Sequence, residues 1–192
     1  MITFSRENEK MLQNLKKVTP ETYYHCIRVK KLVLSMLGRI NADHNCYDQQ
    51  QIDVICKGAL LHDIGKLFVQ NYVLTKASSL TEEEMELMCQ HAHRGGEALR
   101  SGLEDNEAQM ILEICQNHHD RIGPEPGDEE KMPLYVQAVA ICDAYDALVN
   151  DRVYHAKYPK EKALEMIEKG ECGRFSPYMI QCLKDITRDL VH

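Results

Sequence analysis

Residues 52–66 read IDVICKGALLHDIGK. The apolar residues of this stretch recur at the spacings of a helix, at Ile52, Ile55, Cys56, Ala59 and Leu60. Such a stripe predicts a helix that packs one face against the protein core. His62 and Asp63 follow at the end of the stripe. We therefore expect this helix to deliver an imidazole and a carboxylate to the interior.

Two other predicted helices carry a histidine beside an apolar stripe. Thr19, Pro20 and Glu21 form a helix start, with a capping residue, a proline at the first helical position and an acid in the first turn. The face downstream carries His25, Val29, Leu32, Met36 and Ile40. Thr81 and Glu84 have the spacing of a capping box and open the second of these helices. Its periodic residues are Met85, Met88, His91, Ala92 and Leu99.

Two more predicted helices lie on either side of a polar segment. One runs from about residue 105 to the pair His118 and His119. The other begins at Pro133 and carries Asp143 near its apolar face. Residues 123–131 between them are glycine, proline and charged residues almost throughout, and we expect this loop to be the most flexible part of the chain.

The remaining sequence also favours helices. Predicted helices from about residue 160 to Gly170 and from Ser176 and Pro177 onward complete the chain. There is no convincing strand alternation, internal repeat or low-complexity segment. A chain of 192 residues with 44% hydrophobic residues can bury one sizeable core. We therefore expect a single all-α domain over residues 1–192, a bundle of about seven to eight helices.

The charge balance limits the partners of the protein. The chain has 23 basic and 30 acidic residues and a formal net charge of -7, which disfavours broad capture of a nucleic acid polymer or an anionic membrane. Its first residues are charged, and no apolar run reaches the roughly 18 residues of a membrane span. We expect a cytoplasmic protein whose partner is a small molecule.

The eight cysteines do not form a recognisable metal or disulfide pattern. They are scattered along the chain without a CxxC pair. Several lie in apolar helical stretches, where a reduced cysteine behaves as a small hydrophobic residue. We therefore expect buried thiols in a reducing compartment and assign no cysteine a ligand role.

Five predicted helices each bring ionisable side chains close to their apolar face. These side chains are His25, His62, Asp63, His91, His118, His119 and Asp143. Any one of the histidines alone would be read as a hydrogen-bonded core residue. Because buried imidazoles and carboxylates are costly unless they are paired or coordinated, the set as a whole favours a shared metal cluster. Nitrogen and oxygen ligands without thiolates favour a catalytic centre over a structural zinc site.

At these residues the sequence resembles a known family. ALLHDIGK, residues 59–66, resembles the signature of HD-domain metal-dependent phosphohydrolases. The other motifs resemble the HD-GYP branch, whose best-known members hydrolyse cyclic di-GMP. They are His91 followed by Gly95 and Leu99, HHDR at 118–121, MPL at 132–134, ICDAYDAL at 141–148, DRVY at 151–154 and GRFSP at 173–177. The resemblance covers about residues 18–185, the expected core of the domain, with a short helix before it.

The resemblance implies a dinuclear metal site. One divalent ion would be held by His25, His62, Asp63 and Asp143. The second would be held by His91, His118 and His119, with Asp63 bridging the two. Iron or manganese is implied first, with zinc, nickel or magnesium as alternatives. The implied reaction is attack on a phosphoester by a hydroxide that bridges the two ions, which makes Asp63 a catalytic residue as well as a ligand.

Three further residues have roles that the sequence leaves open. By the resemblance Lys66 is a catalytic residue that contacts a substrate phosphate oxygen, although a lysine at a helix end also suits the helix dipole. Some relatives hold a third metal with a glutamate at the position of Glu21, although an acid in a first turn is favourable by itself. Arg152 matches a position that contacts guanine or phosphate, and an exposed arginine also needs no function.

One segment departs from the HD-GYP branch. Where the branch has a glycine-rich loop with Gly-Tyr-Pro, residues 122–131 read IGPEPGDEEK. The metal ligands are intact, but the surroundings of the substrate differ. Two classes of function therefore remain: a cyclic dinucleotide phosphodiesterase or a phosphohydrolase for another nucleotide, and a metal-retaining ligand-binding or signalling module with little or no turnover. A homodimer and a separate signalling partner are both left open.

Overall fold

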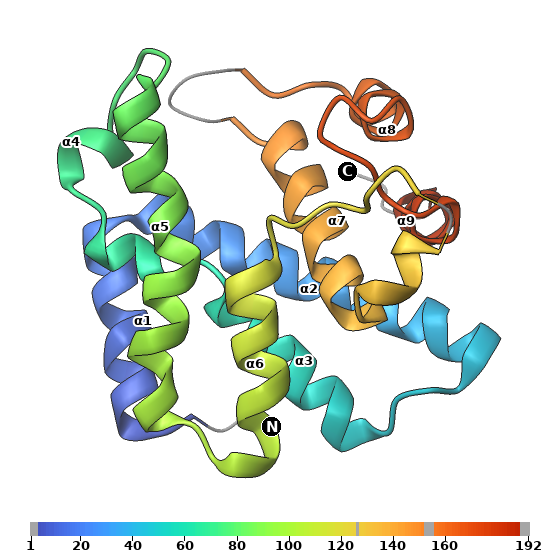
Figure 1. The fold of residues 1–192 in the computed structure, drawn as a ribbon, viewed down its shortest axis with the longest axis horizontal. Helices are drawn as coiled ribbons and strands as arrows, with labels where there is room; N and C mark the ends of the chain where they lie inside the picture. The colour runs from blue at the N-terminus through green and yellow to red at the C-terminus, as the bar shows by residue number, and fades with distance from the viewer. Residues whose placement is uncertain (1–3, 126, 152–155, 189–192) are drawn as a thin grey trace.

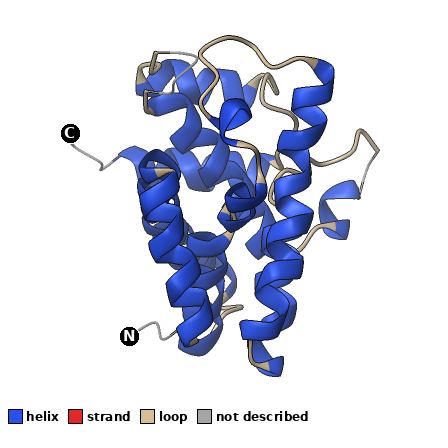
Figure 2. Cartoon of the chain, turned by 90° about the vertical axis from the view of Figure 1, so that its left-hand side faces the viewer, coloured by secondary structure: helices blue, strands red, loops and turns tan. Residues whose placement is uncertain are grey.

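The computed structural model describes residues 4–125, 127–151 and 156–188. Within these ranges the chain is all-helical, as predicted, and contains no strand (Figures 1 and 2). The α-helices are α1 (Arg6–Val18), α2 (Pro20–His44), α3 (Gln49–Leu61), α4 (Asn71–Leu74), α5 (Glu82–Leu99), α6 (Asp105–Asn117), α7 (Leu134–Val149), α8 (Lys160–Glu168) and α9 (Pro177–Arg188). Three short 3-10 helices are η1 (Ile64–Phe68), η2 (Arg100–Gly102) and η3 (Asp128–Lys131). The described helices exceed the predicted seven to eight because α4 is a single turn without a periodic apolar pattern.

Local capping signals set several helix starts. Thr81 and Glu84 form the predicted capping box at α5, each side chain bonded to the backbone of the other residue. Asp48 and Gln51 form a second capping box at α3, which the sequence analysis missed. Thr19 stands at the N-cap of α2 as predicted, but its side chain makes no capping hydrogen bond. Proline at the first position of α2 therefore remains the favourable feature of that helix start.

The long helix α2 joins the two sides of the molecule. In Figure 1 it runs across the molecule behind the other helices, with α1 and α5 on the left and α7, α8 and α9 on the right. α2 packs against α1, α3, α7 and α9, and α3 packs against α6. On the left of Figure 1, α5 packs against α6 and η1. The ends of α3 and α6, the second turn of α2 and the middle of α5 and α7 thereby come within reach of one another.

The hydrophobic core has two clusters that meet at α2 and α3. One lies among α1, α3, α5 and α6 and includes Leu15, Leu61, Ile64, Leu99 and Ile111. The other lies among α2, α3, α7, α8 and α9 and includes Met36, Ile55, Ile141, Ile167 and Met179. α7 is buried on nearly all sides, since every residue from Tyr135 to Asp146 is buried. Any polar side chain in the middle of α7 therefore needs an internal partner.

One local expectation is wrong. Met85 is predicted on the core face of α5, but it is 49% exposed because the first turns of α5 extend beyond the cores.

The described part of the polar loop 123–131 contains η3. Asp128 accepts a hydrogen bond from the Glu125 backbone N–H at 2.9 Å and pairs with Lys131 at 2.6 Å. The flexibility of this loop stays a prediction.

All eight cysteines are free thiols, and five of them are buried, as the sequence indicates. Among the described residues, no helix combines the length and the apolar character that a membrane crossing requires.

Candidate metal centre

The seven side chains singled out in the sequence gather at one place. His25 comes from α2, His62 and Asp63 follow α3, His91 lies on α5, His118 and His119 follow α6, and Asp143 lies on α7. Six of them are at most 8% exposed, and only His119 is more open. Their ligand atoms lie within 4.8 Å of one another in three overlapping groups. These groups are His25, His62 and Asp63; His62, His118 and Asp143; and His91, His118 and His119.

Asp63 lies between two sets of histidines. Its Oδ2 is 3.8 Å from His25 Nε2 and 3.6 Å from His62 Nε2. Its Oδ1 is 3.2 Å from His91 Nε2 and 3.9 Å from His118 Nε2. The two oxygens of one carboxylate thus face two different groups of nitrogen atoms.

Three histidines are oriented by the backbone of their own helices. In His62, His91 and His118 the ring Nδ1 is within hydrogen-bond distance of the carbonyl oxygen three residues earlier, at 2.8, 2.5 and 2.9 Å respectively. Since a carbonyl oxygen only accepts, Nδ1 carries the proton in each ring. In its neutral form each ring then presents a lone pair on Nε2 toward the centre, which is the usual arrangement of a metal-ligating histidine.

Several polar atoms at the centre lack a hydrogen-bond partner among the described residues. His62 Nε2 and Asp63 Oδ1 are buried and unpartnered. His91 Nε2 lies 3.4 Å from His118 Nε2, although both rings direct a lone pair there. Unpartnered acceptors in a dry interior are costly. The donor set, imidazole and carboxylate without thiolate, fits divalent cations of the iron, manganese or zinc type.

The pKa values of these side chains suit metal ligation. Burial alone would raise the pKa of Asp63, but Lys66 and His62 outweigh it and hold the pKa well below its usual range. Burial lowers the pKa of His118 well below its ordinary value and that of His119 to about 4. Ionised carboxylates and neutral imidazoles are the forms that bind metals.

His62 differs from the other histidines in its proton affinity. Burial opposes its charge, but the carboxylates of Asp63 and Asp143 raise its pKa well above the ordinary value. A proton on His62 thus balances buried negative charge when no cation is bound. A cation held there would displace that proton.

Two glycines let the backbones of η1 and α5 touch. A Cβ atom on Gly65 would lie 1.8 Å from the carbonyl oxygen of His91 and 2.7 Å from the amide nitrogen of Gly95. A Cβ atom on Gly95 would in turn lie 3.0 Å from the nitrogen of Gly65. This close approach brings His91 to Asp63 and explains the glycine in both motifs.

Asp146 and Arg28 belong to the site, although the sequence analysis gave them no role. His25 Nδ1 lies 2.6 Å from Asp146 Oδ2, and Arg28 donates two hydrogen bonds to the same carboxylate, at 2.8 and 2.9 Å. The sequence held two signals: Asp146 follows Asp143 by three residues, and Arg28 follows His25 by three residues. A spacing of three places Asp143 and Asp146 on one side of α7, and His25 and Arg28 on one side of α2.

Three further residues were assigned possible roles from the sequence. Lys66 Nζ pairs with Asp63 Oδ2 at 2.6 Å at the edge of the cluster. Glu21 is exposed on α2 and belongs to none of the three ligand groups found among the described residues. Arg152 lies outside the described residues.

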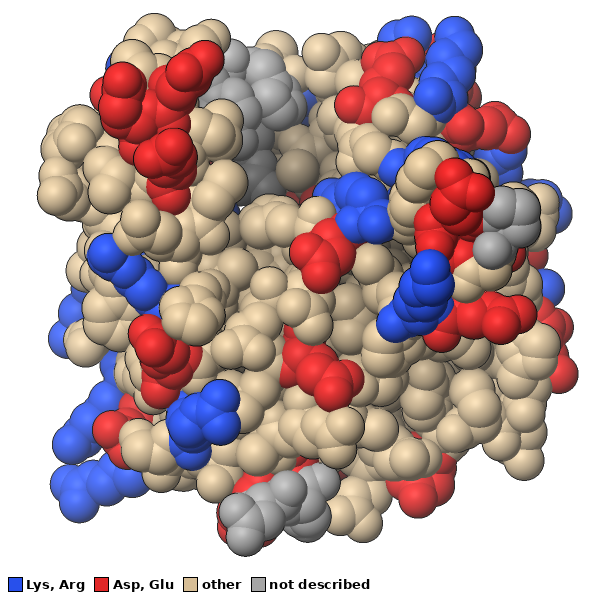
Figure 3. Space-filling view, viewed as in Figure 1, with Lys and Arg blue, Asp and Glu red and all other residues tan. Residues whose placement is uncertain are grey.

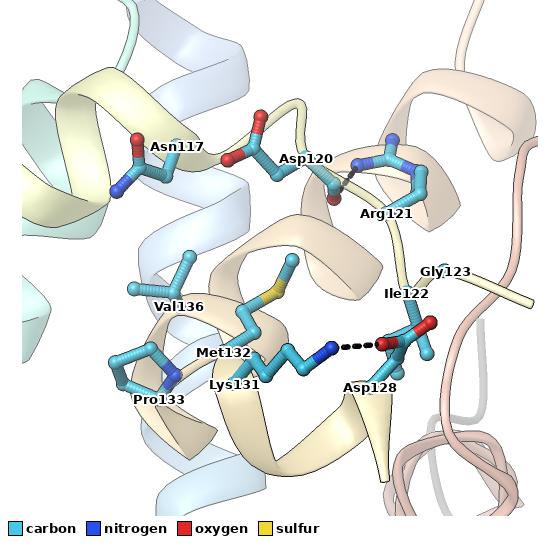
Figure 4. A pocket seen from close by; sticks show the side chains of 10 residues that line it. All are labelled: Asn117, Asp120, Arg121, Ile122, Gly123, Asp128, Lys131, Met132, Pro133 and Val136. Carbon is cyan, nitrogen blue, oxygen red and sulfur yellow. Dashed lines mark hydrogen bonds and ion pairs between the residues drawn. The ribbon is translucent and has the colours of Figure 1, made fainter. Parts of the chain in front are cut away.

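A cavity of about 380 Å³ adjoins the turn that carries His118 and His119 (Figure 4). Arg121 in its wall donates to the carbonyl oxygen of Asp120 at 2.8 Å, and its guanidinium stacks on Phe175 at 4.7 Å. The ion pair between Lys131 and Asp128 closes the other side, as the dashed line in Figure 4 shows. The cavity therefore has both charges in its walls and is built partly from the loop that departs from the HD-GYP pattern.

The outer surface carries mixed charges. On the face drawn in Figure 3, acidic and basic side chains are interspersed. Acidic residues gather at the upper left, where Glu82, Glu83 and Glu84 form the first turn of α5. A mixed surface of this kind does not attract a polyanion over a broad area.

Comparison with known proteins agrees with this geometry. The family model described as HD domain matches residues 22–148. The chain is 28% identical to a cyclic di-GMP phosphodiesterase of Vibrio cholerae over 89% of this chain and 37% of that protein. It is 32% identical to a cyclic di-GMP phosphodiesterase of Thermotoga maritima over 88% of this chain and 46% of that protein. The chain thus spans less than half the length of these two relatives.

A solved structure has the same fold. It is described as Bd1817, an HDG"Y"P protein from Bdellovibrio bacteriovorus, and superposes with a TM-score of 0.64 at 22% identity. The match covers 86% of this chain and 52% of the other.

Proposed function

Because this chain belongs to the HD-domain family, we propose that it is a metal-dependent phosphohydrolase that cleaves a cyclic dinucleotide, with cyclic di-GMP as the first substrate to test. The observation that carries the proposal is the convergence of seven imidazole and carboxylate side chains at one place, where His62 Nε2 and Asp63 Oδ1 have no hydrogen-bond partner among the described residues. Relatives that are named cyclic di-GMP phosphodiesterases support the substrate class.

We assign two divalent ions to the cluster. The first would be held by His25, His62, Asp63 and Asp143, and the second by His91, His118 and His119. The position of the two Asp63 oxygens, each facing one set of nitrogens, supports a bridging role for this carboxylate. Iron or manganese suits the mixed nitrogen and oxygen ligands. A third ion at Glu21 and a contact of Arg152 with the substrate stay predictions.

When bound, such ions supply Lewis acidity toward a phosphoryl oxygen and lower the pKa of water. The side chains of this protein provide the rest. Burial of the ligands excludes bulk water and strengthens each electrostatic interaction. Lys66, whose ammonium lies against Asp63, would bind a phosphate oxygen once the charge of Asp63 is taken up by metal. The adjoining cavity would accommodate a flat apolar part of the substrate against Ile122 and Met132.

The test combines metal content and turnover. Purified protein is incubated with Mn²⁺ or Fe²⁺ and cyclic di-GMP, and linear dinucleotide and mononucleotide are separated by chromatography. We expect hydrolysis by the wild type and none by Asp63→Ala, which should also lose metal. Asp43→Ala serves as the matched control, because Asp43 forms surface contacts with Arg39 and Tyr178 far from the cluster. Retention of both metal equivalents in Asp63→Ala would contradict the assignment.

The second candidate is a metal-retaining binding or signalling module with little turnover. It is favoured by one observation: Asp120 and Asp128, both acidic, line the cavity beside the cluster, where an anionic dinucleotide would have to approach. Tight binding of cyclic di-GMP by the metal-loaded protein without product formation would select this candidate. A homodimer and a separate signalling partner stay predictions.

A further inference from the structure

We propose that Arg28 and Asp146 form a positioning pair that holds the His25 ring in the orientation and tautomer required for cation binding, an inference that rests on the proposed metal-dependent function. The pair connects α2 to α7, and its members are 118 residues apart in the sequence. Neither residue belongs to the ligand groups.

His25 is oriented differently from the other buried histidines. The Nδ1 atoms of His62, His91 and His118 face carbonyl oxygens of their own helices, which cannot move without unwinding the helix. His25 Nδ1 instead faces a side chain, Asp146 Oδ2, at 2.6 Å. A carboxylate on a rotatable side chain fixes a ring only if it is itself held in place.

Three hydrogen bonds from two neighbours, Arg28 and Asn150, hold the Asp146 carboxylate. Arg28 Nε donates to Oδ1 at 2.8 Å and Arg28 Nη2 donates to Oδ2 at 2.9 Å, a two-pronged contact that fixes the plane of the carboxylate. Asn150 Nδ2 donates to Oδ1 at 3.0 Å. The side chain of Asp146 is 3% exposed, whereas that of Arg28 is 36% exposed. Arg28 thus compensates a buried charge from the edge of the site.

The other ring nitrogen of His25, Nε2, faces the proposed ligands. His25 Nε2 lies 2.9 Å from Asp143 Oδ1 and 3.8 Å from Asp63 Oδ2. A proton on Nε2 would bond to Asp143 and block both atoms as ligands. Asp146 draws the ring proton to Nδ1, and its negative charge makes Nε2 a stronger donor to a cation. Arg28 therefore acts on the metal site through Asp146, without touching a ligand.

The test compares Mn²⁺ binding by wild type, Arg28→Gln, Asp146→Asn and the double variant, measured by calorimetric titration of metal-free protein. The control is Arg39→Gln. Arg39 lies on the same helix, is 32% exposed and pairs with two aspartates, but it is remote from the cluster. Loss of an outer-sphere partner costs roughly 10–100-fold in metal affinity. We expect about tenfold weaker binding of one ion in Arg28→Gln and about twofold or less change in Arg39→Gln.

Two readouts distinguish positioning from general stability. In Zn²⁺-loaded, ¹⁵N-histidine-labelled protein, the His25 Nδ1 proton should be observed in wild type and in Arg39→Gln, and lost or broadened in Arg28→Gln. In the double-mutant cycle, Arg28→Gln should cost far less in a background that already carries Asp146→Asn. Because Arg28 is partly exposed, its variant keeps the test valid even if Asp146→Asn fails to fold.

The outcomes separate this inference from the proposed function. If wild type binds two ions and Arg28→Gln binds them equally tightly, the positioning pair is refuted while the metal centre stands. Additive losses in the double variant would likewise refute it. If wild type binds no divalent ion, the proposed function fails as well.

Discussion

The contact between Gly65 and α5 allows a substitution test of how the site is assembled. A methyl group on Gly65 would lie 1.8 Å from the His91 carbonyl oxygen, whereas ordinary contacts begin at 3.4 Å. The backbones of η1 and α5 would have to separate by the difference, about 1.6 Å. Because the obstacle is backbone rather than a flexible side chain, we expect Gly65→Ala to cost about 3 kcal/mol, the upper part of the usual range for overpacking.

The same displacement acts on the ligands. His91 Nε2 lies 3.2 Å from Asp63 Oδ1. A movement of this size would take the two atoms to about 4.8 Å, the outer limit of the ligand spacings in the cluster, and an ion with bonds of about 2.0–2.2 Å would be held more weakly there. We therefore expect Gly65→Ala to lose one metal equivalent. The assays are elemental analysis of the purified protein and urea denaturation.

The control is Gly38→Ala. Gly38 lies within α2, and a Cβ atom there would meet nothing within 4 Å. We expect this variant to gain about 0.5–1 kcal/mol from the better helix propensity of alanine and to keep its metal. If Gly65→Ala had wild-type stability and wild-type metal content, the link between the glycine contact and the site would be refuted.

Three further predictions concern single residues and pH. If the Lys66 ammonium binds a substrate phosphate, Lys66→Met should keep both metal equivalents but lower kcat/KM about 10–100-fold, measured by steady-state hydrolysis. Unchanged kinetics would leave Lys66 only a role at the helix end. Burial opposes charge on His62, but Asp63 raises its pKa, so a proton must leave His62 before metal binds there. The affinity for metal should therefore fall by up to about tenfold per pH unit as the pH is lowered. Calorimetry in buffers of different ionisation enthalpy should detect the released proton, and a metal affinity that is independent of pH would contradict this prediction. Thr81→Ala removes the capping box with Glu84 and should lower the free energy of unfolding by about 1 kcal/mol. The metal content should not change, because the first turn of α5 is remote from the cluster. Loss of metal would show that the cap helps to position His91.

The convergence of the candidate ligands could be predicted from the sequence because each of these side chains is tied to a local pattern. His25 and His91 share a face with aliphatic residues of one helix, and His62 and His118 stand where an apolar stripe ends. A helix that buries its stripe also buries these side chains. Because five such helices pack in one small domain, their buried ionisable side chains meet in its interior.

The parts of the site that were missed depend on contacts between distant segments. Arg28 and Asp146 look like ordinary helix charges until α2 is packed on α7. The contact between Gly65 and Gly95 likewise appears only when η1 packs on α5. Met85 was wrongly placed in the core because the periodicity of α5 continues past the point where neighbouring helices end. Periodicity predicts which face is apolar, but not how far the partner extends.

Two helices end at the cluster, α3 at His62 and α6 at His118. Aligned peptide dipoles leave a partial negative charge at such ends, and it adds to the carboxylates of Asp63 and Asp143. If the cluster holds divalent ions as proposed, these negative ends would favour a cation over a phosphate at the site. Metal would then have to bind before an anionic substrate, because the bound cation would reverse the sign of the local potential.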